Sequence, residues 1–315
     1  MLNLLLNENM KIYRRLRTWI LVAVVIVITT AVLIIVHNTN KAPQVKGDWK
    51  ATIQQQIDND QKMLKSPNLR QQMEKTQIEA ELKVNQYRLE HNKPPTDQSF
   101  WGRVLTGTKL INLVTIFTII LAADSVAGEF SGGTIKMLLI RPASRSKILL
   151  SKYISVFGFA ILLLVVLYGS SLLISGMLEG FSDLGAPYIY AASDGIVHEV
   201  NMVGHVLSTY GYRCIEMIMI VTMAFMISTV FRSSSIAIAS SVGILFLGTA
   251  IGKFLAQFSW AKYYLFENTD LTQYLNGSPK IAGMTLQFSI IVLLLYFVIF
   301  NVLSWVVFKK RDVAA

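Results

Sequence analysis

The four histidines and the acidic residues near them are the first candidates for chemistry in this sequence. They are His37, His91, His198 and His205. His198 and His205 lie near carboxylates in "HEVNMVGH", but they are seven residues apart. A zinc-binding H-E-x-x-H helix places its two histidines four residues apart on one face. The sequence therefore predicts no metal site and no catalytic residue, and a membrane-embedded enzyme is kept only as an alternative.

A second chemically distinctive group lies in "DSVAGEFSGGTIKMLLIRPASRSKILLSK", residues 124–152. Glu129 precedes a Gly-Gly pair, and the short apolar stretch 135–140 follows that pair. Three basic residues come next: Arg141, Arg145 and Lys147. A helix of one or two turns is not stable alone in water, so this stretch is predicted to dock on its own bundle or on a partner protein. The basic residues could pair with lipid phosphates or with an acidic protein surface.

Six apolar segments surround these residues and predict the fold class. Of 315 residues, 53% are hydrophobic and only 15% are charged, whereas a soluble domain has about 25% charged residues. A helix needs about 20 mostly apolar residues to cross a bilayer. The apolar segments are 19–36, 110–123, 153–177, 214–231, 236–252 and 285–308. The second and fifth are short and need flanking residues to complete a span. We expect an all-α polytopic membrane protein with six transmembrane helices.

The distribution of basic residues predicts the orientation of these helices. Lys and Arg are concentrated before the first span, in 124–152 and after the sixth span, and such clusters favour the cytoplasmic side. We therefore expect both termini in the cytosol and the protein in the plasma membrane. The net charge of +10 does not indicate nucleic-acid binding, because most basic residues lie at span ends rather than on one face. The predicted division is 1–18 as a cytosolic interfacial helix, 19–36 as the first span, 37–106 outside the membrane, and 107–315 as spans two to six.

The long segment between the first two spans has the pattern of a helical hairpin. Ile53, Ile57 and Leu64 fall on one helical face. "SPN" interrupts the pattern, with Ser66 as a candidate N-cap and Pro67 at the first helical position. The hairpin is too thin to bury a core by itself, so it should pack on its own outer loops or on a second copy. A solvated spacer and a partner or gating element are both consistent with this composition.

Residues 124–152 resemble a motif of a known family. The pattern E-x(3)-GT-x(4)-L-x(2)-P-x-SR-x(3)-L-x(2)-K is similar to that of permease subunits of type-2 ABC exporters. Here it comprises Glu129, Gly133-Thr134, Leu139, Pro142, Ser144-Arg145, Leu149 and Lys152. The N-terminal "NLLLNENMKIYRRLRTW" also resembles the interfacial elbow helix of that family. The long segment between the first two spans departs from the family pattern, which leaves substrate and external partners open.

The resemblance implies a division of labour between two polypeptides. Residues 135–140 would be a coupling helix that fits a groove on an ATPase subunit, and the N-terminal helix would rest against the same subunit. The residues implied in this contact are Glu8, Arg14, Glu129, Gly133, Thr134, Ile135, Leu138, Leu139, Pro142 and Arg145. The sequence has no G-x(4)-GK-[ST] phosphate loop. ATP and Mg²⁺ would therefore be bound by the partner ATPase, and this chain is expected to hold no cofactor and to be no enzyme.

The family resemblance also implies that two permease chains, identical or sister chains, enclose a pathway between their second and fifth spans. The candidate lining residues are Thr115, Thr118, Ser240 and Thr249, although each hydroxyl could instead bond its own helix. Glu216 is a carboxylate inside a span, and it is either functional or paired with Arg213. An ion-coupled secondary transporter is the other alternative, but the third and sixth spans carry no charge. The sequence does not select a substrate.

Overall fold

The protein is predominantly helical, and the part of the chain that the structure describes has one pair of strands. The computed structural model describes residues 1–40, 49–65, 72–135, 143–181, 184–192, 195–277, 279, 281 and 283–310. Its helices are α1 Leu2–Tyr13, α2 Leu16–Asn40, α3 Trp49–Lys65, α4 Gln72–Glu90, α5 Phe100–Gly107, α6 Ile111–Ser131, α8 Arg145–Glu179, α9 Met202–Val230, α10 Ser234–Leu255, α11 Leu265–Thr269 and α12 Leu286–Lys310. The 3-10 turns are η1 Thr108–Leu110, η2 Ser259–Tyr263 and η3 Leu271–Tyr274, and the strands are β1 Pro187–Ala191 and β2 Val197–Asn201.

Six helical paths within the described residues are long and apolar enough to cross a membrane, as the sequence predicts. They are α2, the continuous path α5–η1–α6, α8, α9, α10 and α12. Within their apolar windows, 56% of the α5–α6 path and 61% of α9 are buried, against 17% in α2 and in α12. The α6–α9 pair is therefore the centre of the bundle, and α2 and α12 expose most of their apolar surface, which suits contact with lipid.

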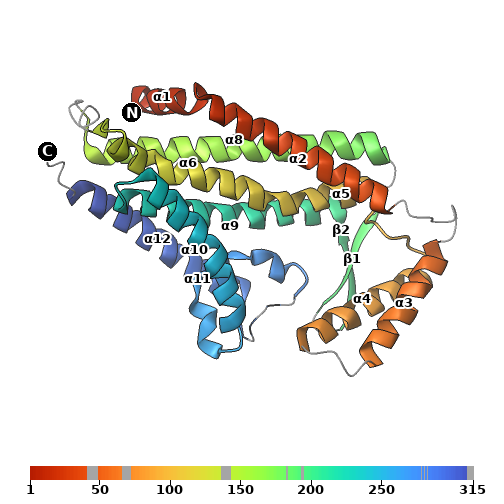
Figure 1. Ribbon diagram of the computed structural model, residues 1–315. Coiled ribbons are helices and arrows are strands. Elements are labelled where there is room, and N and C mark those ends of the chain that lie inside the picture. The colour runs from red at the N-terminus through yellow and green to blue at the C-terminus, as the bar shows by residue number, and fades with distance from the viewer. Residues whose placement is uncertain are drawn as a thin grey trace.

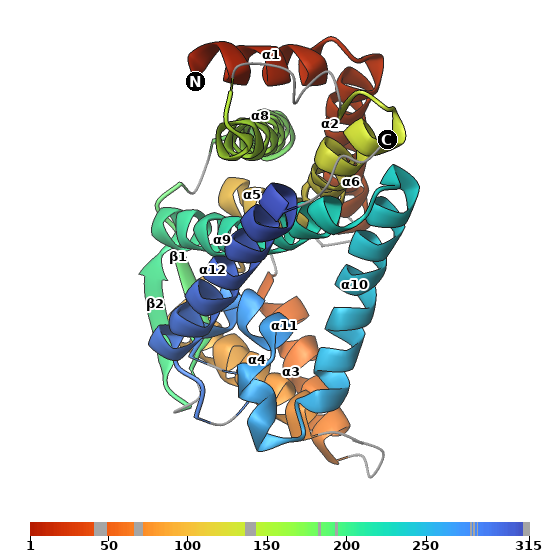
Figure 2. The ribbon, with the colours of Figure 1, turned by 90° about the vertical axis from the view of Figure 1, so that its left-hand side faces the viewer.

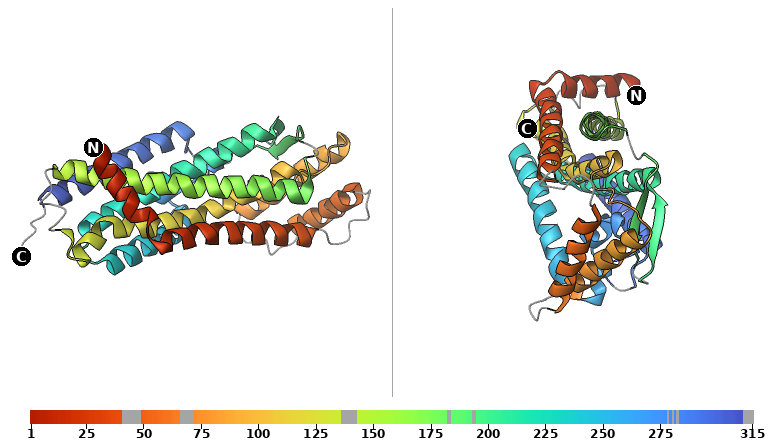
Figure 3. Two further views of the ribbon diagram at one scale, coloured as in Figure 1. Left: turned by 90° about the horizontal axis from the view of Figure 1, so that it is seen from above. Right: turned by 90° about the vertical axis from the view of Figure 1, so that its right-hand side faces the viewer.

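The short helix α1 does not continue the direction of α2. It crosses over the beginning of α8, while α2 runs alongside α8 (Figures 2 and 3). The Thr18 hydroxyl donates to the Ile12 carbonyl over 2.5 Å and fastens the turn between α1 and α2. The beginning of α8 is fixed by Ser144, whose hydroxyl accepts a hydrogen bond from the Lys147 amide. Serine is a favoured N-cap residue, because its hydroxyl can bond an amide of the first helical turn.

The opposite end of the bundle carries α3, α4 and the two strands (Figure 1). Ile53 and Ile57 of α3 are buried, as the predicted apolar face requires. Helix α4 packs against both α3 and β1. The expected break at Ser66 and Pro67 lies outside the described residues. Strands β1 and β2 form an antiparallel pair in the segment that precedes α9, so the all-α expectation misses this small sheet.

The second span is longer than the apolar segment 110–123 suggests. Its helical path begins at Phe100 and ends at Ser131. Three of the charges on this path, Arg103, Asp124 and Glu129, have partners in neighbouring helices. Nε of Arg103 lies 2.6 Å from Oε1 of Glu179 in α8. His37 of α2 contacts the same carboxylate oxygen at 2.8 Å. Paired charges can remain within a helix that an isolated charge would end.

Candidate functional site: a buried charge cluster joining α1, α6 and α8

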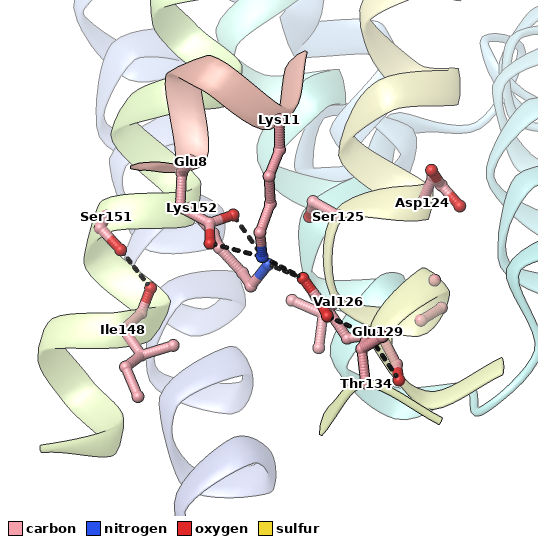
Figure 4. Close-up of polar contacts among 12 residues, drawn as sticks. Glu8, Lys11, Asp124, Ser125, Val126, Glu129, Thr134, Ile148, Ser151 and Lys152 are labelled. Atoms are coloured by element: carbon pink, nitrogen blue, oxygen red, sulfur yellow. Dashed lines mark hydrogen bonds and ion pairs between the residues drawn. The ribbon is translucent and has the colours of Figure 1, made fainter. Parts of the chain in front are cut away.

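Four charged side chains meet where α1 crosses the bundle (Figure 4). Nζ of Lys152, in α8, lies 2.9 Å from Oε2 of Glu8 in α1 and 2.9 Å from Oε1 of Glu129 in α6. Nζ of Lys11, also in α1, lies 3.0 Å from Oε1 of Glu8 and 2.6 Å from Oε1 of Glu129. These four residues, here called the elbow cluster, connect three helices through alternating charges.

The elbow cluster is electrically balanced, with two ammonium groups and two carboxylates. The Lys152 side chain is only 2% exposed, and those of Glu8 and Glu129 are 11% and 12% exposed. Burying a charge is unfavourable unless it is paired and hydrogen-bonded, and both carboxylates are paired with both lysines. Removing one member would leave a buried charge without full compensation, so the four residues stabilise the junction only as a set.

Helical periodicity brings the two cluster residues of α1 together. Glu8 and Lys11 are three residues apart, so they share one face of α1 and can contact each other. Burial lowers the pKa of Lys11, but the hydrogen bonds and charges of Glu129 and Glu8 outweigh it and raise the pKa above its ordinary value. Lys11 therefore stays protonated at neutral pH and keeps α1 attached to α6.

Residues directly after α6 are tied to the same cluster. The Thr134 hydroxyl donates a hydrogen bond to Oε2 of Glu129, so Thr134 closes a turn onto α6. Gly133 has φ +68°, a left-handed conformation that favours glycine, and it allows the chain to reverse there. Ile135 is 5% exposed and joins the core. The predicted contact residues Leu138, Leu139 and Pro142 lie outside the described residues.

Near the elbow cluster, Asp124 of α6 contacts the beginnings of two other helices. Oδ2 of Asp124 lies 3.2 Å from Nη1 of Arg15 and 2.5 Å from Nη2 of Arg17. Its Oδ1 accepts a hydrogen bond of 2.5 Å from the Ser234 hydroxyl in the first turn of α10. Through Asp124, the α1–α2 turn and the beginning of α10 are both attached to α6.

A cavity of about 660 Å³ lies between these two sets of contacts. Its charged lining residues are Glu8, Lys11, Arg15, Arg17, Asp124, Glu129 and Lys152. Most of these groups already pair with one another, so the lining offers no single strong charge to a ligand. The one hydroxyl that the lining shows bonded to a carboxylate is that of Thr134, which donates to Glu129. The two sets of contacts together connect α1, α6, α8 and α10.

Ser228 of α9 strengthens the same part of α6 from its buried side. Its hydroxyl donates to the Ala123 carbonyl at 2.6 Å and accepts from the amides of Val126 and Ala127 at 3.1 and 3.0 Å. Ser228 is completely buried. No sequence pattern indicated this residue, because a serine in an apolar span usually bonds its own helix.

Two other predicted contact residues lie away from the elbow cluster. Arg14 follows the last residue of α1 and is exposed. Nη1 of Arg145 donates to the Lys309 carbonyl at 3.0 Å, which attaches the beginning of α8 to the end of α12. The structure thus brings Glu8, Glu129 and Thr134 together, and it adds Lys11 and Lys152 as the cations between the carboxylates.

The candidate pathway hydroxyls all bond to their own helices. Thr115 and Thr118 are buried and donate to the carbonyls of the residues four positions earlier, at 2.9 and 2.8 Å. Ser240 and Thr249 donate in the same way, at 2.7 and 3.1 Å. Glu216 forms an ion pair with Arg213, which was one of its two predicted roles. Its Oε2 lies 2.7 Å from Nη1 of Arg213.

The segment between α10 and α12 holds a buried carboxylate that the sequence analysis did not single out. Glu267 in α11 is 4% exposed, and its Oε2 has no hydrogen-bond partner among the described residues.

Gly248 and Gly252 of α10 face the segment that contains α11, because a Cβ added to them would meet Phe266 and Glu267 at 2.1 and 2.5 Å. These two glycines, four residues apart, therefore allow α11 to pack closely against α10. Among the described residues, no group of three or more His, Cys, Asp or Glu side chains could hold a metal ion.

Comparison with known families places the chain in one of them. The family model described as "Protein of unknown function (DUF2705)" matches residues 81–314. The chain belongs to the DUF2705 family. The match covers α4 from Glu81 onward and most of the membrane-spanning core, including Glu129 and Lys152. Glu8 and Lys11 of the elbow cluster precede the matched part.

Two similar proteins of Bacillus subtilis (strain 168) extend the comparison. The chain is 42% identical over 318 residues to "Uncharacterized protein YhcI", and the match covers 100% of both chains. It is 33% identical over 221 residues to "Uncharacterized membrane protein YdbK", which covers 69% of this chain and 85% of that protein. The six apolar helices and the similarity to YdbK agree that this DUF2705 protein is a membrane protein. The descriptions of YhcI and YdbK state no activity.

Proposed function

We propose that the chain is the permease subunit of a type-2 ABC exporter and works with a separate ATPase subunit that binds ATP and Mg²⁺. One structural observation supports this proposal in addition to the sequence motif in residues 124–152. The elbow cluster joins α1 to the end of α6 and the beginning of α8, the two helices that flank the predicted coupling segment 135–140. A segment pushed by a partner protein needs such a rigid attachment to the membrane helices.

In this proposal the elbow-cluster end of the bundle faces the cytosol. Helix α1 is then the interfacial elbow helix at the plasma membrane, in contact with lipid and with the ATPase. The α3–α4 pair is the extracytoplasmic hairpin. The concentration of Lys and Arg near the ends of α1, α8 and α12 supports this orientation.

The contacts suggest how movement at 135–140 would reach the transport pathway. Glu129 and Lys152 make the ends of α6 and α8 move together with α1. Asp124 carries the displacement to the beginning of α10 through Ser234. A second permease copy or a sister chain would complete the pathway beside α6 and α10, and the substrate would cross by alternating access.

The proposal is tested by purifying the tagged full-length protein from its own cells and identifying the proteins that copurify. We expect an ATP-binding cassette ATPase with the wild type and its loss with Leu138→Arg, which places a charge on the apolar side of the coupling segment. Leu184→Arg is the matched control, since Leu184 is exposed at the α3–α4 end of the molecule. The control should retain the ATPase.

Two outcomes would contradict the proposal at different levels. If the wild type copurifies with no ATPase, the exporter assignment is wrong, and a self-contained carrier or enzyme becomes the better explanation. If Leu138→Arg retains the ATPase as the control does, the coupling contact has been assigned to the wrong segment. Size-exclusion profiles of both variants should match the wild type, which separates loss of contact from unfolding.

A further inference from the structure

A second polar cavity lies at the α3–α4 end of the molecule. It has a volume of about 540 Å³ and lies between α3, α4 and β1, within the range of about 300–1,000 Å³ that is usual for small-ligand sites. Its charged lining residues are Asp60, Glu81, Arg88 and Asp97. A hollow of about 240 Å³ shares Arg88 and Asp97 with it. We call the larger space the α3–α4 cavity.

Arg88 is the buried cation of this cavity. Its residue is 8% exposed, and its Nε has no hydrogen-bond partner among the described residues. Burial lowers the pKa of Arg88, while Asp97 and Tyr188 act in the opposite direction. A buried donor without an acceptor is unfavourable, and a guanidinium is well matched to a carboxylate through two parallel hydrogen bonds. The cavity therefore offers a site for an anionic group next to Arg88.

The other part of the cavity is acidic. Burial raises the pKa of Asp60. Glu81 is exposed at the cavity rim, but partial desolvation of its carboxyl raises its pKa, and the charges of Asp60 and Asp97 raise it further. A cationic group placed between Asp60 and Glu81 would relieve this repulsion. The α3–α4 cavity thus has a place for each sign of charge.

The spacing of the two places sets the length of an occupant. Glu81 and Arg88 are seven residues apart on α4, which corresponds to about 10 Å along the helix axis at 1.5 Å per residue. An extended peptide advances about 3.3–3.6 Å per residue. A peptide of about three residues therefore spans the distance between the two charged places.

Strand β1 supplies an edge along which such a peptide can extend. Four consecutive residues, 188–191, line the cavity. Successive side chains of a strand point to opposite faces, so consecutive lining residues indicate that the backbone edge borders the cavity. β1 pairs with β2 on one side, and within the described ranges no other strand pairs with it. An unpaired edge can bind an extended peptide through main-chain hydrogen bonds.

We propose that the α3–α4 cavity binds a short zwitterionic peptide in extended form, with its ammonium group at Asp60 and Glu81, its carboxylate at Arg88, and its backbone along β1. The site needs no second protein and is independent of the exporter assignment. In the orientation proposed above, it samples peptides outside the cell.

The test measures binding of trialanine to the purified full-length protein in detergent by equilibrium dialysis. Three modified peptides accompany it: N-acetyl-trialanine, trialanine amide, and the peptide with both ends blocked. We expect saturable binding of trialanine at millimolar concentrations or below. Blocking either end should weaken binding about tenfold or more, because each removes a charge-assisted hydrogen bond.

Protein variants then assign each end of the peptide to its residue. Arg88→Gln should weaken trialanine but leave the weak binding of trialanine amide unchanged, since the amide already lacks the carboxylate. Glu81→Gln, a substitution at the exposed rim that should not disturb folding, should weaken trialanine but not N-acetyl-trialanine. Lys75→Gln is the control, because Lys75 is exposed on α4 and does not line the cavity.

The proposal is wrong if trialanine binds no better than the doubly blocked peptide. It is also wrong if Glu81→Gln, folded as judged by its size-exclusion profile, weakens all four peptides equally or none of them. In that case the cavity does not distinguish the ends of a peptide, whatever the result for Arg88→Gln.

Discussion

Nζ of Lys152 and Oε1 of Glu129 lie 2.9 Å apart, although the two residues belong to different membrane-spanning helices, α8 and α6. The loop between these helices contains the predicted coupling segment. This pair therefore closes the base of the loop, and Glu8 and Lys11 attach α1 to the same point.

The first prediction concerns the loss of one cation from the elbow cluster. Lys152→Met keeps the side-chain length but leaves Glu8 and Glu129 with Lys11 alone. Removing one partner of a buried ion pair costs about 3–5 kcal/mol, so we expect a clear loss of stability of the purified protein in an SDS titration of mixed micelles.

Lys147→Met is the matched control for this change. Lys147 belongs to the first turn of α8 but is exposed. Lys147→Met should therefore lower the free energy of unfolding by less than about 1 kcal/mol. A double variant, Lys152→Met with Glu129→Gln, should recover part of the lost stability, because it removes one of the uncompensated carboxylates. Equal effects of Lys152→Met and Lys147→Met would show that the cluster is not a structural unit.

The second prediction concerns the close approach of α10 and α11. A Cβ at Gly248 would lie 2.1 Å from Cε2 of Phe266, a ring that is 8% exposed. Gly248→Ala should therefore push α11 away from α10 and destabilise the protein by about 1–3 kcal/mol, as overpacking does elsewhere. Thermal unfolding in detergent would measure the loss.

Gly243 provides the control within the same helix. A Cβ at Gly243 meets no atom within 4 Å, so Gly243→Ala should be neutral or stabilise α10 by up to about 1 kcal/mol through helix propensity. If both substitutions behave alike, the packing of Phe266 on Gly248 does not contribute to stability.

The third prediction concerns the pH dependence of the peptide-free protein. Burial and the nearby charges of Asp60 and Asp97 raise the pKa of Glu81 in the folded state. The folded protein therefore binds this proton more tightly than the unfolded chain does. The resulting stability is present below the unfolded value of about 4.3 and is lost as the pH rises through the folded value.

Glu81→Gln imitates the protonated side chain and should separate this effect from other titrations. We expect its melting temperature to match the wild type near pH 4 and to exceed it near pH 7. The gain should be small because Glu81 is exposed at the cavity rim. Glu79→Gln, exposed on the same helix outside the cavity, is the comparison. A gain for Glu81→Gln that is independent of pH would contradict the charge repulsion.

The six membrane-spanning helices could be predicted from the sequence alone, because their long apolar composition is a local property that only a bilayer or a core can satisfy. It also indicated the apolar face of α3, and it offered the pairing of Glu216 with Arg213 as one of two interpretations. Each of these depends on residues close together along the chain, so periodicity and spacing were sufficient to find them.

The pairing of distant charges could not be predicted in this way, because it depends on the folded chain. Lys11 and Glu129 are 118 positions apart, and Arg103 and Glu179 are 76 apart. No local pattern specifies such pairs. Without their distant partners in view, Arg103 and Glu129 look like charges outside the second span, so the span looks shorter in the sequence than it is. The β1–β2 pair and the α3–α4 cavity have the same origin. They depend on how distant segments approach each other, and that approach is set by packing of the whole chain rather than by any one stretch of it.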